Sequence, residues 1–368
     1  MELAEASSFG QHARPEDKVE AKGTPLILKS LRGVRSSQVP VWFMRQAGRS
    51  LPEYRKLREG VAMLDSCLDA EIASEITVQP VRRHKVDAAI FFSDIVIPLK
   101  LAGVAVEILP AIGPVLEKPI QREAAFLELP DPANVDFGLI EKAVLASMAK
   151  LEGTPLLGFG GAPFTLASYL IEGKPSQSIP TCRKMMENNF ELWSKILTWC
   201  AELTARFLQA QIESGVIAVQ LFDSWAGRLS AEEYRRFAKP FSAHAFSSLK
   251  NAIGNNDVPM IHFGVGTKSI LKDMVEVGAS VIGIDSETDI GEASGILENK
   301  VPVQGNLNPE LLLGEWSEIE KASAKILRAA TVAPSHIFNL GHGVLPETNP
   351  EVITRLVEYI HSVDLTKL

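Results

Sequence analysis

The chain is poor in cysteine. Cys67, Cys182 and Cys200 are its three cysteines among 368 residues, and no Cys-x-x-Cys or His-x-Cys pair occurs. The sequence therefore contains no recognisable zinc or redox motif, and this cysteine usage is typical of a reducing cytoplasm. We expect a cytoplasmic protein without a bound metal.

An excess of positive charge is also missing. Lys and Arg number 37 against 45 Asp and Glu, which gives a formal net charge of -8. Nucleic acids and anionic membrane surfaces bind basic faces, so neither is an expected partner. A small anionic substrate would instead require a locally positive pocket.

Long apolar runs and secretion signals are absent as well. The uncharged stretch 153–171 is interrupted by glycines and by Pro155 and Pro163, which favours a buried strand and a glycine-rich loop over a membrane span. Residues 1–22 are polar, mixed in charge and without an apolar segment, so secretion is not expected. We interpret residues 1–32 as a loosely ordered polar extension and residues 33–368 as one catalytic domain.

Short β-branched or aromatic runs recur, with helix-patterned segments between them. We count eight runs, at residues 41–43, 88–92, 156–159, 216–221, 260–263, 281–284, 301–304 and 337–340. Eight such units predict a single α/β domain, a (β/α)8 TIM barrel with its active site at the C-terminal ends of the strands. Doubly wound sheets alternate in the same way, so periodicity alone leaves that fold open. Because no Gly-x-Gly-x-x-Gly opens a helix, a nucleotide-binding function is weakly supported.

Two of the intervening helices have readable boundaries. One should run from about Asp69 to Arg82, and the basic run 82–85 then suits a last helical turn. The final helix should begin after Asn349, a plausible cap, with Pro350 in its first turn.

Polar residues follow most of the predicted strands, which is the pattern of a barrel mouth. They come after successive runs in this order: Arg45 and Arg49, Asp94, Gly160 and Gly161, Asp223 and Ser224, Asp285, Asn306, and His342. His262 also lies at a strand end. A lone Tyr, Ser or His in such a place more often packs, caps or turns, so each needs support from its neighbours.

The segment Met44-Arg45-Gln46-Ala47-Gly48-Arg49 carries two guanidiniums four residues apart. A guanidinium is planar, keeps its charge when a site closes and matches a carboxylate with two parallel hydrogen bonds. An exposed salt bridge is the ordinary explanation of a single Arg-x-x-x-Arg pair. The pair predicts a site for carboxylates or phosphates once other blocks agree with it.

The hexapeptide 44–49 closely resembles the N-terminal signature of the uroporphyrinogen decarboxylase family, whose members trim acetate side chains of a tetrapyrrole to methyls. Further blocks follow in the family's order: Phe-Ser-Asp-Ile at 92–95, Gly-Phe-Gly-Gly-Ala-Pro-Phe-Thr at 158–165 leading to Tyr169, Gln-Leu-Phe-Asp-Ser-Trp-Ala-Gly at 220–227, Gln-Gly-Asn-Leu at 304–307 and Asn-Leu-Gly-His-Gly at 339–343. The resemblance covers the chain from about residue 33 onward. Ser50 departs from it, because the family signature usually continues with Tyr, and we expect a modest loosening of the loop beside Arg49.

The resemblance implies decarboxylation of the four acetate arms of uroporphyrinogen III to give coproporphyrinogen III in porphyrin and haem biosynthesis. It implies no cofactor, because the protonated pyrrole ring accepts the electrons that carbon dioxide leaves behind. Asp94 is the expected catalytic residue, since a carboxylate in a dry pocket accepts hydrogen bonds from pyrrole N–H groups and opposes the developing positive charge. The structural alternative for Asp94 is a cap of the next turn.

The other positions carried over by the resemblance bind substrate. They are Arg45, Gln46, Ala47, Gly48, Arg49, Asp94, Tyr169, Ser224 and His342. Arg45 and Arg49 should hold carboxylate arms, and Phe159 and Phe222 should form apolar walls. An arginine, a histidine or a bound water could each donate the proton. The family also implies a homodimer.

Two rival functions stay open at this point. Corrinoid or methylthiol methyltransferases of the same superfamily bind zinc through His and Cys, but the segment 260–267 contains no cysteine. A non-catalytic tetrapyrrole carrier would need the arginines and would not need the buried anion Asp94.

Overall fold

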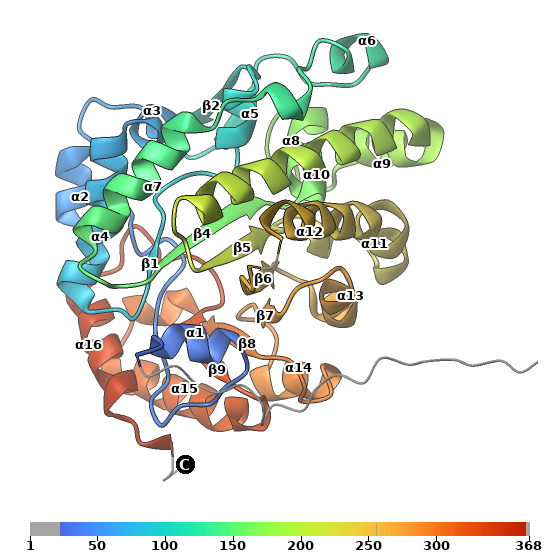
Figure 1. Cartoon of the computed structure of the whole chain (residues 1–368). Helices are drawn as coiled ribbons and strands as arrows, with labels where there is room; N and C mark the ends of the chain where they lie inside the picture. The colour runs from blue at the N-terminus through green and yellow to red at the C-terminus, as the bar shows by residue number, and fades with distance from the viewer. Residues whose placement is uncertain (1–22, 255, 366–368) are drawn as a thin grey trace, which may run out of the picture.

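The computed structural model describes residues 23–254 and 256–365 of the chain. Its centre is a curled parallel sheet of seven strands, in the order β1-β4-β5-β6-β7-β8-β9 (Figure 1). The strands are β1 (Ala89–Ile90), β4 (Leu156–Gly161), β5 (Ala218–Phe222), β6 (Met260–Phe263), β7 (Val281–Gly283), β8 (Val303–Leu307) and β9 (His336–Leu340). Neighbouring strands follow each other in the chain, as crossover helices require.

Helices surround this sheet (Figure 1). In chain order they are α1 (Leu26–Leu31), α2 (Pro52–Leu57), α3 (Met63–Leu68), α4 (Ala70–His84), α5 (Ile97–Leu101), α6 (Glu123–Phe126), α7 (Gly138–Lys150), α8 (Pro163–Glu172), α9 (Pro180–Asn188), α10 (Phe190–Glu213), α11 (Ala231–Phe237), α12 (Lys239–Ile253), α13 (Leu271–Glu276), α14 (Ile290–Ile296), α15 (Trp316–Ala329) and α16 (Pro350–Ser362). No helix in the described ranges is long and apolar enough to cross a lipid bilayer.

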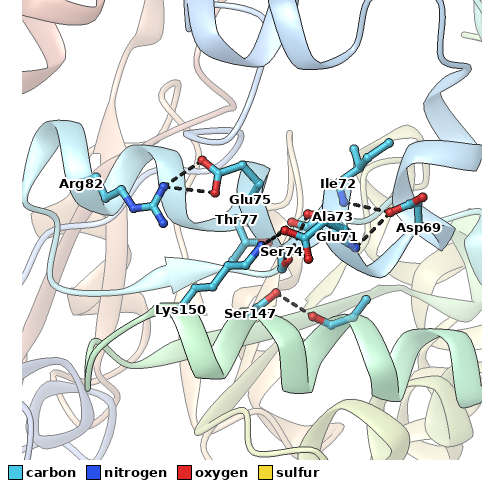
Figure 2. Close-up of polar contacts among 11 residues, drawn as sticks. Asp69, Glu71, Ile72, Ala73, Ser74, Glu75, Thr77, Arg82, Ser147 and Lys150 are labelled. Atoms are coloured by element: carbon cyan, nitrogen blue, oxygen red, sulfur yellow. Dashed lines mark hydrogen bonds and ion pairs between the residues drawn. The ribbon is translucent and has the colours of Figure 1, made fainter.

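The two readable helices are confirmed. Asp69 caps α4 by accepting hydrogen bonds from the backbone N–H groups of Glu71 and Ile72 (Figure 2), and Asn349 caps α16. Figure 2 also shows how α4 joins α7, where Lys150 pairs with Glu71 at 2.6 Å. The basic residues 82–84 lie in the last turn of α4, where cations are favourable.

Strand β4 packs closely on α10 because its glycines leave room. A Cβ atom on Gly158 would lie 2.6 Å from Gln211 Oε1, and one on Gly160 would lie 3.2 Å from Leu208. Gln211 uses this proximity to bond the backbone of Phe159 at both its N–H and its carbonyl. The glycine-rich run thus brings helix and strand together, and α8 begins directly after it.

Seven of the eight predicted runs are strands, and the eighth is represented by an isolated bridge. Val41 pairs in parallel with Phe338 of β9. On its other side the Val41 carbonyl accepts from the Asp87 N–H at 2.8 Å, and the Asp87 carboxylate accepts from the Val41 N–H at 2.7 Å. The segment around Val41 therefore lies between β9 and the residues that lead into β1.

Two features were not predicted. An antiparallel pair, β2 (Val106–Leu109) with β3 (Gly113–Leu116), forms a second small sheet. The prediction that residues 1–32 are a loose extension is wrong for residues 26–31: they form α1, and its Ile27 and Leu31 are buried in the apolar cluster inside the curled sheet. Residues 1–22 lie outside the described ranges.

Candidate active site

The candidate site lies at the C-terminal ends of the strands. The turn at 44–49 follows the Val41 bridge, Asp94 follows β1, Ser224 follows β5, and His342 follows β9. Tyr169 comes from α8, which begins directly after β4. Loops and one helix from five parts of the chain thus supply the predicted residues to one edge of the sheet.

Arg45 has an unusual backbone conformation, with φ near 60°. Left-handed backbone at a residue with a Cβ costs roughly 1–3 kcal/mol and persists where the surroundings impose it. Here Met44 donates its N–H to Asn339 Oδ1 at 3.0 Å, and its carbonyl accepts from Val344 at 2.9 Å. These bonds fix the turn that carries the exposed Arg45 side chain.

The Gln46 side chain is fully buried and holds this turn. Its Oε1 accepts from the Phe43 N–H at 2.9 Å, and its Nε2 donates to the Ala88 carbonyl at 3.0 Å. Ala47 and Gly48 are half-buried, and a Cβ on Gly48 would lie 2.8 Å from the Arg45 carbonyl. Gln46 is thus engaged with the backbone, while Ala47 and Gly48 set the path of the loop.

Arg49 is exposed at the end of the turn, and its carbonyl accepts a hydrogen bond from Arg55 at 3.0 Å. The neighbouring Ser50 is buried, and its hydroxyl has no hydrogen-bond partner among the described residues. The position where a tyrosine was expected is therefore enclosed by protein.

Asp94 is partly exposed as a residue and lies within electrostatic range of Arg45. Desolvation of its carboxyl raises its pKa above the ordinary value, and this is opposed by the Val96 N–H, which donates to Oδ1 at 3.0 Å, and by the positive charge of Arg45. The same carboxylate thus accepts the hydrogen bond from the Val96 N–H and lies within electrostatic range of Arg45. Asp94 is therefore both a turn-forming residue and a carboxylate held in a poorly solvated place.

Tyr169 is buried, and its ring centroid lies 4.6 Å from that of Trp225. Burial raises the pKa of Tyr169, the charge of Asp94 raises it further, and the Trp225 side chain lowers it through a hydrogen bond. The phenol therefore stays protonated at neutral pH, as a hydrogen-bond donor toward the site must.

His342 is exposed beside two glycines that let the loop come close to its neighbours. A Cβ on Gly341 would lie 2.1 Å from the Ser286 N, and one on Gly343 would lie 2.5 Å from Arg45 Cδ. Desolvation and then the charge of Arg45 lower the pKa of His342, while a bond to the Gly343 backbone raises it. At neutral pH the imidazole is therefore uncharged, and it can accept or donate a hydrogen bond.

Ser224 is exposed on the loop after β5. Below it the aromatic rings of Phe159, Phe222 and Phe263 form a row, with centroid separations of 5.4 and 5.9 Å and edge-to-face contacts. Phe222 remains partly exposed. These rings belong to the apolar cluster inside the curled sheet and give the mouth an apolar floor.

Three residues predicted at the mouth point elsewhere. Asp223 and His262 are fully buried, with Nε2 to Oδ2 at 3.6 Å, and Asp223 accepts from Thr165 of α8 at 2.9 Å. They lie between the sheet and the helices because alternate strand residues face opposite sides. Asp285 is buried too and accepts from the Gly266 N–H at 2.5 Å and from Thr288, so it organises loops.

Sequence reasoning missed two contributors, Trp225 and Arg228. Arg228 stacks on the Trp225 ring at 4.0 Å, and Trp225 contacts Tyr169. The signal that could have found them was their place next to Ser224, because Trp225 belongs to the same block, Arg228 directly follows it, and a Trp and an Arg three residues apart in a loop can stack.

In the described part of the chain, no three His, Cys, Asp or Glu side chains come together in an arrangement that could hold a metal ion. All three cysteines are free and buried, and burial raises the pKa of each thiol. A thiol whose pKa is raised is a poor zinc ligand, because zinc binds the thiolate.

A parallel α/β sheet with arginines, a desolvated carboxylate, a tyrosine and a histidine at its C-terminal edge is the arrangement of an enzyme for small anionic molecules. The sequence model described as "Uroporphyrinogen decarboxylase (URO-D)" matches residues 23–363. The chain therefore belongs to the uroporphyrinogen decarboxylase family, as its motifs predicted.

Individual relatives agree with this assignment. The chain is 52% identical over 340 residues to a uroporphyrinogen decarboxylase of Arthrobacter sp. (strain FB24), covering 92% of this chain and 97% of that protein. It is 49% identical to one of Leifsonia xyli subsp. xyli, covering 91% and 93%. Among solved structures, a methyltransferase from Methanosarcina mazei superposes with a TM-score of 0.76 over 91% of this chain and 96% of that one, at 18% identity. That last likeness shows a shared fold.

Proposed function

We propose that this protein decarboxylates the acetate side chains of uroporphyrinogen III to methyls, giving coproporphyrinogen III in porphyrin biosynthesis. It is a carboxy-lyase, in agreement with the names of relatives about half identical along nearly its whole length. The observation that carries the proposal is the placement of the poorly solvated Asp94 carboxyl within electrostatic range of Arg45.

The chemistry follows from this arrangement. A pyrrole ring carbon gains a proton and the ring becomes cationic. The carbon–carbon bond to the carboxylate then breaks, carbon dioxide leaves, and the bonding electrons neutralise the ring. A second proton then adds to the exocyclic carbon to complete the methyl group, and the first proton leaves the ring carbon, which restores the neutral pyrrole. Asp94 opposes the ring charge and accepts from pyrrole N–H groups, so the substrate serves as its own electron sink and no cofactor takes part.

The remaining residues bind the carboxylate arms in this proposal. Arg45 and Arg49 are exposed guanidiniums on one turn, Arg45 lies within electrostatic range of Asp94, and both suit bidentate binding. Tyr169 and Ser224 donate hydrogen bonds from their hydroxyl groups to the carboxylate arms. Neutral His342 binds an arm or transfers a proton. Gln46, Ala47 and Gly48 act by positioning Arg45. The apolar rings of Phe159 and Phe222 face the tetrapyrrole.

The methyltransferase and carrier alternatives are disfavoured for separate reasons. A zinc thiolate site would require the buried cysteines to ionise against the raised pKa of each thiol. A protein that only carries the tetrapyrrole has to bind eight ligand carboxylates, and positive side chains serve that purpose. The desolvated carboxylate of Asp94 would weaken such binding. The Asp94 environment therefore favours catalysis.

We also propose that the fold closes as an eight-stranded barrel. Support comes from the Val41 bridge to β9, from the paired bonds between Val41 and Asp87, and from the chain of side-chain bonds inside. In that chain Trp42 donates to Gln304, which donates to Gln220 on the opposite strand β5. Slow amide exchange at Val41 and Trp42, comparable to that of β9, would agree with closure.

The assembly and the compartment are proposals as well. We propose a homodimer, by analogy with the family, to be tested by light scattering across a range of protein concentrations. A cytoplasmic location is supported by the three free, buried cysteines and is testable by fractionating cells of the source organism.

The deciding experiment is an anaerobic incubation of the purified, metal-stripped protein with uroporphyrinogen III, followed by oxidation and chromatography of the porphyrins. Products with seven, six, five and four carboxylates that form at the same rate with and without chelator are expected. Unchanged octacarboxylate from a folded protein would reject the decarboxylase, and zinc with a corrinoid methyl donor would then be the next assay.

A further inference from the structure

Arg228 is a half-buried cation on the loop that carries Ser224. Its guanidinium carbon lies 4.0 Å from the centre of the Trp225 ring, and the Trp225 centroid lies 4.6 Å from that of Tyr169. Trp225 thus contacts both the cation and a member of the candidate site. The stacking gives the guanidinium a fixed plane and leaves its N–H edge available.

That edge lacks a protein partner. Nη1 of Arg228 is buried without a hydrogen bond, and the described residues form no ion pair with its guanidinium. The nearby carboxylate of Glu172 bonds the Cys182 N–H at 2.9 Å instead. Burying an unpaired charged donor costs free energy, so such a group in a native protein calls for a partner.

The loop backbone holds Arg228 in place independently of its side chain. Arg183 donates to the Arg228 carbonyl at 2.8 Å and also pairs with Glu233. Glu233 in turn completes a capping box with Ser230 at the start of α11. Replacing the Arg228 side chain therefore leaves the bonds that shape its backbone intact, which makes the guanidinium itself testable.

We propose that Arg228 is a third guanidinium for substrate carboxylates, which receives one arm of the tetrapyrrole on the Tyr169 side of the mouth, apart from Arg45 and Arg49. The inference deepens the proposed function and rests on it for the identity of the ligand. A tetrapyrrole with eight carboxylates offers more anions than two arginines can bind. Tyr169 lies within electrostatic range of Asp94, Arg45 and Arg228, which places the three charged side chains in the neighbourhood of one tyrosine.

The test compares Arg228→Gln, which removes the charge, with Arg228→Lys, which keeps the charge and loses the planar fork. Arg236→Gln is the matched control, because Arg236 stacks on the Phe237 ring at 4.8 Å but is exposed on α11. Binding of uroporphyrin, with eight carboxylates, and of coproporphyrin, with four, is measured by quenching of tryptophan fluorescence. KM and kcat for uroporphyrinogen III are measured in parallel.

For Arg228→Gln we expect the Kd for uroporphyrin and the KM to rise by about tenfold or more, with kcat within a few-fold of wild type and an unchanged circular dichroism spectrum. Arg228→Lys should recover part of the affinity, and Arg236→Gln should match wild type. If Arg228→Gln raises the Kd for both porphyrins, Arg228 binds a propionate arm, which both of them carry. If it raises the Kd for uroporphyrin alone, Arg228 binds an acetate arm. Unchanged Kd for both porphyrins in Arg228→Gln would overturn the inference.

The binding assay separates this inference from the proposed function. If wild type binds uroporphyrin but leaves uroporphyrinogen unchanged, the decarboxylase proposal fails while the Kd values still decide the role of Arg228. If turnover is normal and Arg228→Gln binds both porphyrins like wild type, the function stands and the role of Arg228 is rejected.

Discussion

The Arg45 side chain lies across Gly343, so that a Cβ atom on Gly343 would be 2.5 Å from Arg45 Cδ and 2.8 Å from Cγ. The glycine after His342 therefore makes room for the arginine that follows the Val41 bridge. Because Arg45 also influences Asp94 and His342 electrostatically, this contact decides where the positive charge of the mouth is placed.

Gly343→Ala should displace Arg45. The backbone of Gly343 does not adopt the left-handed region, and Arg45 is exposed and free to change rotamer, so the melting temperature should stay close to wild type. Loss of a charge-assisted contact should raise KM for uroporphyrinogen by roughly tenfold to a hundredfold. Gly295→Ala is the control, since nothing lies within 4 Å of a Cβ there. An unchanged KM in Gly343→Ala would show that Arg45 does not depend on this space.

The titration of His342 reports on the same arginine. Its pKa is lowered by desolvation and by Arg45, so the folded protein binds this proton at lower pH than the unfolded chain does. The contribution of His342 to the free energy of unfolding therefore declines as the pH falls from 6.5 toward the lowered pKa of the folded protein. Arg45→Gln should move the pKa of His342 upward and narrow that interval, as followed by NMR with His342→Gln for assignment.

Arg49→Gln is the matched control for that titration, because it removes a guanidinium from the same turn while keeping Arg45, whose charge lowers the pKa of His342. Its His342 should titrate as in wild type. Equal upward shifts in both variants would mean that the general charge of the mouth, and not Arg45 in particular, sets the pKa of His342.

Asp94→Asn should separate activity from stability. Asparagine keeps an Oδ1 atom that can accept from Val96, so the turn should survive. A charge pair about 4 Å apart at an effective dielectric near 20 is worth roughly 4 kcal/mol, which corresponds to about a thousandfold in turnover. Since desolvation raises the pKa of Asp94, its ionised form weakens the fold at neutral pH, and the variant should melt at the same or a higher temperature.

The control for Asp94→Asn is Asp131→Asn, which caps an exposed turn in the same way by accepting from the Ala133 N–H at 2.8 Å. It should keep full activity. Near-normal turnover of Asp94→Asn in the uroporphyrinogen assay would remove Asp94 from the mechanism and leave it as a capping residue.

The sequence was a good guide to the strands for a physical reason. Strands of a parallel sheet are buried on both faces, so they form apolar runs that stand out, and β6 was predicted at residues 260–263, where it occurs. The hairpin β2–β3 was missed because its strands are partly exposed and mix polar with apolar residues. The segment around Val41 was predicted as a strand, and in the structure it pairs with β9 through a single bridge to Phe338.

The site was harder to predict because it depends on which way each side chain points. Gln220 and Phe222 face the inside of the curled sheet, so the period of two sends Asp223 toward α8. A motif match shows that Asp223 and Ser224 are adjacent in the sequence. It does not show that their side chains point in different directions. The unpaired guanidinium of Arg228 is likewise invisible in the sequence, because it becomes evident only when its neighbours are known to bond elsewhere.

Thr165 joins the buried layer to the mouth. Its hydroxyl donates to Asp223 Oδ1 at 2.9 Å and accepts from the Trp225 N–H at 3.3 Å, while Asp223 Oδ2 has no hydrogen-bond partner among the described residues. Thr165→Val removes both bonds and leaves the carboxylate poorly satisfied. We expect the free energy of unfolding to fall by about 1–3 kcal/mol in denaturant titrations.

The same change should loosen the turn that carries Ser224 and Trp225, so KM should rise a few-fold while the tryptophan emission shifts. Thr165→Ser keeps the hydroxyl and should retain both quantities, whereas Thr165→Ala, which lacks the hydroxyl without adding a methyl, should change them as Thr165→Val does. Ser147→Ala is the control, because Ser147 bonds the Ala143 carbonyl of its own helix, away from the mouth. If Thr165→Val loses stability but keeps the wild-type KM, the Thr165–Asp223 pair supports the fold alone, and the position of Ser224 is set by the loop itself.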